Sequence, residues 1–593
     1  MNSKRSKFLF GERIRSNFKE LLSRDFWKKA GREISDFFGK FPKTIRVLRP
    51  NERRVIIILS IAIIVSAIIL FRNYYLTRTT LNPQKGGVYI EGVAGSPKYL
   101  NPLLARSEVD RGIARILFLS LVNFDANGQP APNLANAFNV QDSGRRYDFV
   151  LDDKISWQDG AKITADDVDF TLNILQSDGY SGPFSRSFDG VEIEKKSETE
   201  FSLILPETNS SFISILSELG ILPKHIWKDV KPELLDKSEL NLNPTGNGRY
   251  SFDPKTNKKN SNDEIVLKRA AAYKKDDKGY FDQIIFRSYN SPSDLVEAYR
   301  KGEINGFGGF TPNDISSIDR NTFRYYRLLI PRFTAVFLNL EKENLKELKL
   351  RQALASSVDK EQIIKEAYGG DAEMLKSPIP SFVAGFNSEI KDYPFNLDTA
   401  GAILSELKYI DSDNDGIREK DGKKLELNLY TTDDPALQKT SDLISTNWNK
   451  IGIKTKVIVI DLLTLQKTII PSRQYDVVVL GENLDYPPDP YPYFHSSQID
   501  DGLNISAYKN LAVDTLLEDA RLSIDPNVKA EKLKSFSSII AEDLPAISIA
   551  CAPYLYGTNI SIKGIPKKRV AQNSSDRFLE IGSWYIKTER KNK

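Results

Sequence analysis

Cysteine and histidine are scarce in this chain of 593 residues. The single cysteine, Cys551, excludes an intramolecular disulfide, so a chain outside the cytoplasm must depend on a large hydrophobic core. The two histidines, His225 and His495, argue against a histidine-rich metal enzyme and against a histidine-based triad. The motifs G-x-S-x-G and H-E-x-x-H are also missing. We therefore predict no catalytic residues and no cofactor.

Long hydrophobic runs are equally scarce, since only residues 55–71 form one. This run, VIIILSIAIIVSAIILF, has 17 residues, no charge and two serines. A bilayer core needs about 17 to 25 apolar residues in a helix, so we predict a transmembrane helix over residues 55–76. A buried core helix and a cleaved signal peptide are the alternatives. The 54 residues before the run argue against a signal peptide, and the lack of a cysteine after it excludes lipid attachment there.

Charge is unevenly distributed about this run. Residues 1–54 hold 16 Lys and Arg against 6 Asp and Glu, a net charge of +10 in a chain whose total is +4. Positive charge stays on the cytoplasmic side, which predicts a single-pass cell-membrane protein with a cytoplasmic N-terminus and the main domain outside. The basic extension is either an amphipathic helix on the inner leaflet or a loosely ordered tail. Residues 77–84 read as a linker.

A strand, a turn and a helix are predicted around residue 160. Asp159-Gly160 is a strong turn signal, and Thr164 is suited to cap the helix that follows. Asp166 and Asp167 then occupy the first turn, where the helix dipole favours acids. This pattern specifies local structure and no reaction.

Six segments in chain order carry a resemblance to a known family. They are LNPL at 100–103, WQDGAKITADDV at 157–168, PTGNGRY at 244–250, AYRKGEIN at 298–305, RQAL at 351–354 and DYPPDP at 485–490. Together they resemble landmarks of the family 5 extracellular solute-binding proteins, which are the oligopeptide, dipeptide and nickel receptors of ABC importers. The resemblance spans roughly residues 85–560.

This resemblance implies an α/β, two-lobed periplasmic-binding-protein fold (type II-like) with a hinge and an interlobe cleft. Lobe I would comprise residues 85–330, lobe II residues 331–545, and residues 546–593 would return to lobe I. The implied function is capture of a peptide or peptide-like solute and its delivery to an ABC permease and ATPase. A solute sensor or an envelope protein on the same scaffold is the alternative, and an anchored cell-wall or peptide hydrolase is a weaker one. The near-neutral outer part gives no reason to expect nucleic acid.

Five residues are candidates for ligand binding. Asp485 follows a predicted buried strand, and the resemblance implies an acid there for a peptide ammonium, with Asp489 as the competing alignment. Either acid could instead cap a turn before proline. Tyr491 could line the cleft or pack the hinge, Trp157 could flank a bound chain or serve as a packing anchor, and Tyr508 could contact ligand or hold its loop in shape.

An acidic loop at residues 411–422 is a weak candidate for calcium. Asp411, Asp413 and Asp415 alternate before Gly416, as in the first half of an EF-hand loop. The twelfth position, where an EF-hand needs a bidentate Glu, is Gly422. The alternative interpretation is an acidic turn leading into a hairpin. No other metal site is predicted.

Overall fold

The computed structural model describes residues 49–256, 264–276, 278–500 and 502–592, and these form two compact units. One unit comprises residues up to 82 together with 588–593, and the other comprises residues 83–587. The predictions for the basic extension, residues 1–54, lie almost entirely outside the described residues.

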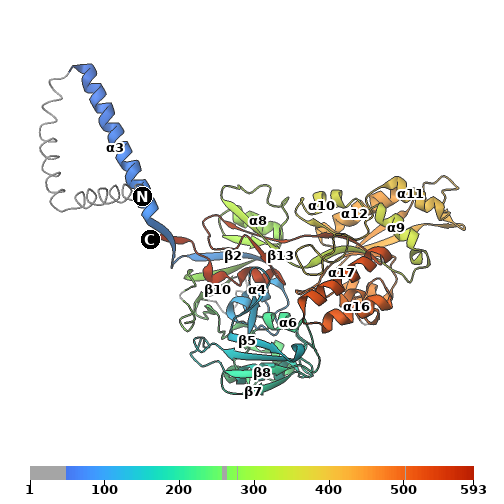
Figure 1. Cartoon of the computed structure of the whole chain (residues 1–593), viewed down its shortest axis with the longest axis horizontal. Coiled ribbons are helices and arrows are strands. Elements are labelled where there is room, and N and C mark those ends of the chain that lie inside the picture. The colour runs from blue at the N-terminus through green and yellow to red at the C-terminus, as the bar shows by residue number, and fades with distance from the viewer. Residues whose placement is uncertain (1–48, 257–263, 277, 501, 593) are drawn as a thin grey trace, which may run out of the picture. The chain divides into compact units, whose positions relative to one another are not determined.

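The first unit contains one long apolar helix and most of a two-stranded sheet. Helix α3 (Pro50–Arg78), labelled in Figure 1, is a single continuous helix. It has 29 residues, and at 1.5 Å per residue it is about 44 Å long. Its apolar side chains are exposed along the whole run, and among the described residues it alone is long and apolar enough to cross a membrane. Length and composition therefore agree with the predicted span.

The predicted linker at residues 77–84 is wrong, because these residues continue α3 and then form strand β1 (Thr79–Gln84). The partner of β1 is β24 (Lys587–Asn592), at the other end of the chain. The Arg590 guanidinium donates to Thr79 Oγ1 at 2.9 Å and lies over the Tyr75 ring at 5.7 Å. The partner of β1 is some 500 residues away, so the sequence around β1 carries no signal of the pairing. A short polar stretch of this kind therefore has the pattern of a linker.

Lobe I of the second unit is built on two sheets. The larger has the strand order β23-β13-β22-β12-β2-β11-β10-β9, and the smaller has the order β5-β6-β8-β7. The larger sheet consists of β2 (Val88–Ala94), β9 (Tyr250–Phe252), β10 (Glu264–Arg269), β11 (Gln283–Tyr289), β12 (Gly306–Gly308), β13 (Phe323–Leu329), β22 (Tyr554–Asn559) and β23 (Lys568–Val570). The smaller consists of β5 (Ala135–Gln141), β6 (Arg146–Leu151), β7 (Glu192–Lys195) and β8 (Glu200–Ile204). The main helices are α4 (Glu108–Leu117), α5 (Ala165–Leu175), α6 (Phe212–Glu218) and α8 (Pro292–Arg300).

Helix α5 and the turn before it confirm two parts of the predicted strand–turn–helix, whereas the predicted strand is only an isolated bridge between Ser156 and Lys162. Thr164 is its N-cap residue, and the Thr164 amide donates to Asp167 Oδ2 at 2.9 Å in a capping box. The same Asp167 carboxylate also accepts from the indole of Trp157 at 3.3 Å. One acid thus joins the turn to the helix.

Lobe II is built on a sheet with the order β15-β21-β14-β20-β18-β19. Its strands are β14 (Arg332–Leu338), β15 (Glu373–Met374), β18 (Glu426–Thr432), β19 (Lys454–Ile460), β20 (Val477–Asn483) and β21 (Ala546–Cys551). Its main helices are α9 (Leu348–Ser356), α10 (Lys360–Ala367), α11 (Leu397–Glu406), α12 (Pro435–Lys450), α16 (Leu511–Leu522) and α17 (Pro526–Asp543). The shorter elements of lobe II are β16 (Glu419–Lys420), β17 (Lys423–Lys424), α13 (Leu462–Thr464), α14 (Ile470–Ser472) and α15 (Tyr491–Phe494). Those of lobe I are β3 (Val122–Phe124), β4 (Pro130–Pro132) and α7 (Lys224–Trp227).

Two chain crossings connect the lobes, one between β13 and β14 and one between β21 and β22. The Arg332 guanidinium links them, because its Nε donates to the carbonyl of Ala552 at 2.7 Å. Strand β21 pairs with β14 in the lobe II sheet, so residues 546–551 do not belong to lobe I as predicted. A fully buried strand suits either sheet, and its sequence does not reveal which one it joins.

Candidate functional site

Two cavities lie where the lobes face each other. The first has a volume of about 700 Å³. Its charged lining residues are Arg186, Asp189, Glu207 and Glu218 from lobe I and Asp485, Asp489 and Arg521 from lobe II. The second has a volume of about 580 Å³ and reaches the hinge. Its charged lining residues are Glu108, Arg332, Asp371, Asp434 and Glu482.

Asp485 opens the loop that follows β20 and lines the first cavity. Its backbone is left-handed, with φ of 59°, a conformation that Asp tolerates better than most residues. Within the described chain its carboxylate has no hydrogen bond or ion pair. Surrounding protein and the nearby Asp489 charge raise its pKa to about 6. Such a carboxylate is suited to receive a cationic group of a ligand.

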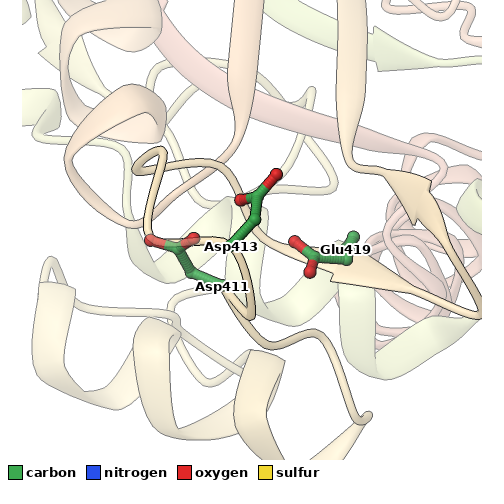
Figure 2. A group of neighbouring side chains, drawn as sticks. All are labelled: Asp411, Asp413 and Glu419. Atoms are coloured by element: carbon green, nitrogen blue, oxygen red, sulfur yellow. The ribbon is translucent and has the colours of Figure 1, made fainter.

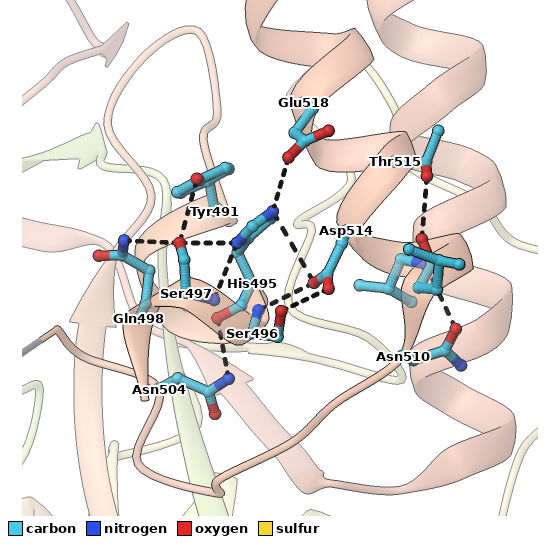
Figure 3. A network of polar contacts seen from close by, with 12 residues as sticks. Tyr491, His495, Ser496, Ser497, Gln498, Asn504, Asn510, Asp514, Thr515 and Glu518 are labelled. Carbon is cyan, nitrogen blue, oxygen red and sulfur yellow. Dashed lines mark hydrogen bonds and ion pairs between the residues drawn. The ribbon is translucent and has the colours of Figure 1, made fainter. Parts of the chain in front are cut away.

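Asp489, the competing candidate, already has a cationic partner. Arg521 donates to Asp489 Oδ2 from Nε at 2.8 Å, and its guanidinium lies over the Tyr491 ring at 3.7 Å. Tyr491 in turn stacks on His495, with ring centroids 4.0 Å apart. His495 contacts Glu518 at 3.2 Å in the polar network of Figure 3. Asp489 and Tyr491 therefore belong to a packed stack at the edge of the cavity.

The lobes touch beside the first cavity. The Ser210 amide of lobe I donates to the carbonyl of Arg521 in lobe II at 3.1 Å. The buried Lys529 ammonium donates to Ser210 Oγ at 3.0 Å, and the Ser214 hydroxyl donates to the carbonyl of Tyr486. These direct contacts across the cleft describe a closed arrangement of the two lobes.

Strand β20 has a free edge in the cleft. It pairs with β14 along its length, whereas its pairs with β18 stop at Val478. If the same register continues, Thr432, the last residue of β18, lies opposite Leu480. Strand β20 therefore extends beyond the end of β18. The Leu484 amide donates to the carbonyl of Pro331, the residue before β14, and in this register the even-numbered residues of β20 direct their backbone groups to β14. The Gly481 and Asn483 amides therefore face the open edge.

Trp157 and Tyr508 do not line either cavity, which corrects their assignment as ligand-binding candidates. The Trp157 side chain is fully buried in the core of lobe I. Tyr508 is buried in lobe II, and its hydroxyl donates to Asp543 Oδ2 at 2.5 Å. Both residues stabilise local structure.

A lysine contacts two acids of the acidic loop. In Figure 2, Asp411, Asp413 and Glu419 lie around one point, with carboxylate oxygens within 4.8 Å of one another. The Lys424 ammonium contacts Asp413 at 3.1 Å and also pairs with Asp415. Residues 419–424 form the β16–β17 hairpin, so the structure favours the acidic turn over the calcium loop.

The structure adds Gly481, Glu482 and Arg521 to the site. Gly481 and Glu482 come just before Asp485, in GENLD at 481–485. The sequence signal that could have identified them is a short polar stretch directly after a buried strand. Arg521 comes from α16 and carried no such signal, because helix spacing alone does not reveal a contact with a distant loop.

Comparison with known proteins gives consistent matches. The model of the family described as bacterial extracellular solute-binding proteins, family 5 Middle, matches residues 129–502. The oligopeptide-binding protein AppA of Bacillus subtilis is 28% identical over 471 residues, covering 78% of this chain and 86% of AppA. Its solved structure in complex with a nonapeptide gives a TM-score of 0.69 at 26% identity, covering 85% of this chain and 100% of that one.

Two further solved structures also match, and one of them holds a different ligand. NikZ of Campylobacter jejuni, in complex with Ni(L-His), gives a TM-score of 0.68 at 26% identity and covers 84% of this chain and 99% of NikZ. CtaP of Listeria monocytogenes, described as an ABC transporter substrate-binding protein, gives 0.73 at 23% identity. That match covers 85% of this chain and 100% of CtaP, and at this identity it is evidence for the fold alone. The predicted two-lobed α/β fold is confirmed.

Proposed function

Because this chain belongs to the bacterial extracellular solute-binding proteins of family 5, we propose that it captures peptides between its lobes and presents them to the permease of an ABC importer. The similarity to AppA, solved with a nonapeptide, supports a peptide ligand. Binding without covalent chemistry is the inferred role, with ligand favouring the closed lobes.

The free edge of β20 is the observation that carries this proposal. An extended peptide can add to an exposed strand edge through main-chain hydrogen bonds, which gives affinity regardless of side chains. Gly481 and Asn483 present amides at this edge, and Gly481 also presents its carbonyl. The Asn483 carbonyl accepts from the Tyr493 hydroxyl at 2.5 Å, so it is already satisfied. The edge lies at the second cavity and leads to Asp485 in the first.

Asp485 fits the peptide ammonium in this arrangement. A peptide lying antiparallel to β20 would have its first residue opposite Asn483, which brings its amine toward Asp485 two residues further on. Asp489 is held by Arg521, so it is the less suitable partner.

Peptides retained by the protein test this function. We expect the full chain, extracted in mild detergent and denatured, to release peptides with free amino termini that mass spectrometry identifies. Synthetic versions of these peptides should raise the melting temperature of ligand-stripped protein, because a ligand that binds only the native state stabilises it. Release of no peptide, together with no stabilisation by a broad peptide library, would argue against the proposal.

We also propose that α3 anchors the protein in the cell membrane, with residues 83–587 outside. Its length and apolar surface support this placement. We expect the mature protein to keep the full mass of 67.1 kDa and to resist alkaline extraction from membranes. A mature chain lacking about the first 76 residues would instead identify the helix as a signal peptide.

A further inference from the structure

Glu482 is an acid in the cleft that the proposed binding of the peptide main chain does not use. It lies on β20 between the two residues whose amides face the open edge, and it lines the second cavity. Its cross-strand partner on β14 is Phe333, which packs against Tyr493 with ring centroids 5.7 Å apart. The Glu482 side chain is therefore on the same face of the sheet as the Phe333 ring.

Glu482 also lacks a cationic partner among the described residues. Two other acids of the second cavity have one: Asp371 accepts from Arg327 Nε at 2.9 Å, and Glu108 pairs with Arg577 at 3.2 Å. Burial raises the pKa of Glu482 to about 7, while the neighbouring Tyr493 hydroxyl lowers it. A carboxylate in this situation gains strongly from a cation that enters the cavity.

The second cavity as a whole is acidic. Its one cationic lining residue, Arg332, donates to hinge carbonyls, with Nε to Ala552 at 2.7 Å. Asp434, on the β18 side, caps α12 by accepting from the Ala436 amide at 2.9 Å. The cavity thus offers acids to a ligand and no available cation among the described residues, which disfavours an acidic side chain.

The ladder geometry specifies which ligand residue meets Glu482. Directly opposed residues of an antiparallel pair have their side chains on the same face, with Cβ atoms about 4.5–5.5 Å apart. With the first peptide residue opposite Asn483, the second lies opposite Glu482. Its side chain would therefore emerge beside the Glu482 carboxylate.

Resting on the proposed peptide-binding function, we propose that Glu482 selects peptides with a lysine or arginine as their second residue. The cationic head would form a charge-assisted hydrogen bond with the Glu482 carboxylate. The second cavity supplies the room, with its volume of about 580 Å³. Glu482 would then determine specificity, while the edge of β20 and Asp485 provide affinity common to all peptides.

Hexapeptides that differ only at one position test this selection on the full chain in detergent. With alanine elsewhere, we expect lysine at position two to bind about 10-fold or more tightly than norleucine, which has nearly the same shape without the charge. The same exchange at position one or three should change affinity less than about 3-fold. A stronger preference at either of those positions would overturn the assigned register.

Glu482→Gln should reduce the lysine preference at position two to less than about 3-fold while leaving the affinity for the norleucine peptide unchanged. Asp434→Asn is the matched control, because asparagine keeps the helix cap and the preference should persist. Retention of the preference in E482Q, or its loss in D434N, would overturn the assignment to Glu482. If all hexapeptides bind alike, this proposal alone is wrong; if none binds, the peptide-binding function itself is contradicted.

Discussion

Replacing Asp485 by asparagine is expected to weaken the binding of a free-amine peptide by about 30- to 1000-fold, or roughly 2–4 kcal/mol. The substitution keeps the shape of the side chain and removes the charge that the ammonium needs inside the closed cleft. Because no described residue pairs with this carboxylate, its loss should leave the fold intact. Calorimetric titration of the full chain in detergent, with circular dichroism as the check on folding, gives the measurement.

N-terminal acetylation of the peptide is the matched control on the ligand side. Acetylation should cost the wild-type protein about as much as D485N does, and it should cost the variant little more, since both changes remove the same ion pair. The pKa of about 6 adds a pH dependence: affinity should be highest near pH 7 and fall toward 10-fold per pH unit below pH 6, as Asp485 becomes protonated. Affinity should also fall above about pH 8, where the peptide amine loses its proton. Independent, additive losses would contradict the assignment of the ammonium to Asp485.

Gly481→Pro is expected to reduce peptide affinity by about 100-fold, whereas Gly481→Ala should change it less than about 3-fold. Proline removes the amide that faces the open edge, and its ring projects into the space of the added strand. The sheet should survive, because the even-numbered residues of β20 make the hydrogen bonds to β14. A Cβ at Gly481 would meet Thr334 Oγ1 at 3.7 Å, an ordinary contact, so alanine is tolerated.

Titration of both glycine variants with one peptide separates the two effects. If G481P binds as tightly as G481A, the peptide does not add to the edge of β20 and the main-chain mode is wrong. Loss of binding in both variants would mean that Gly481 is needed for close approach, and the amide would then not be the cause. Melting temperatures within a few degrees of the wild type are required of both variants.

The sequence located Asp485 because its signal is local. A run of buried β residues followed by a polar, proline-rich loop places an acid at a strand end, and strand ends in α/β lobes lie at the ligand side. The free edge of β20 carries no such signal. It exists because β18 ends at Thr432, and the relation between two strands some 50 residues apart depends on register, which the chain encodes only through packing.

Burial explains the misassigned ligand candidates. Trp157 belongs to a segment that resembles the family and Tyr508 lies within the span of the resemblance, yet a resemblance marks positions that matter without saying whether they matter for packing or for binding. Asp167 holds the indole of Trp157, and Asp543 holds the hydroxyl of Tyr508, each from a different element. The polar partners of large aromatic residues are tertiary contacts, and local sequence patterns do not predict them.

The position of β22 in lobe I has a consequence for synthesis on the ribosome. This strand lies between β12 and β13, and β23 pairs with the other side of β13, so the N-terminal lobe cannot complete its sheet until residue 570 has been made. Lobe II, by contrast, takes its sheet from one continuous stretch, residues 332–551. The lobe that is synthesised second can therefore finish folding first, and the lobe that follows α3 in the sequence must wait with unpaired strand edges until almost the whole chain has been translated.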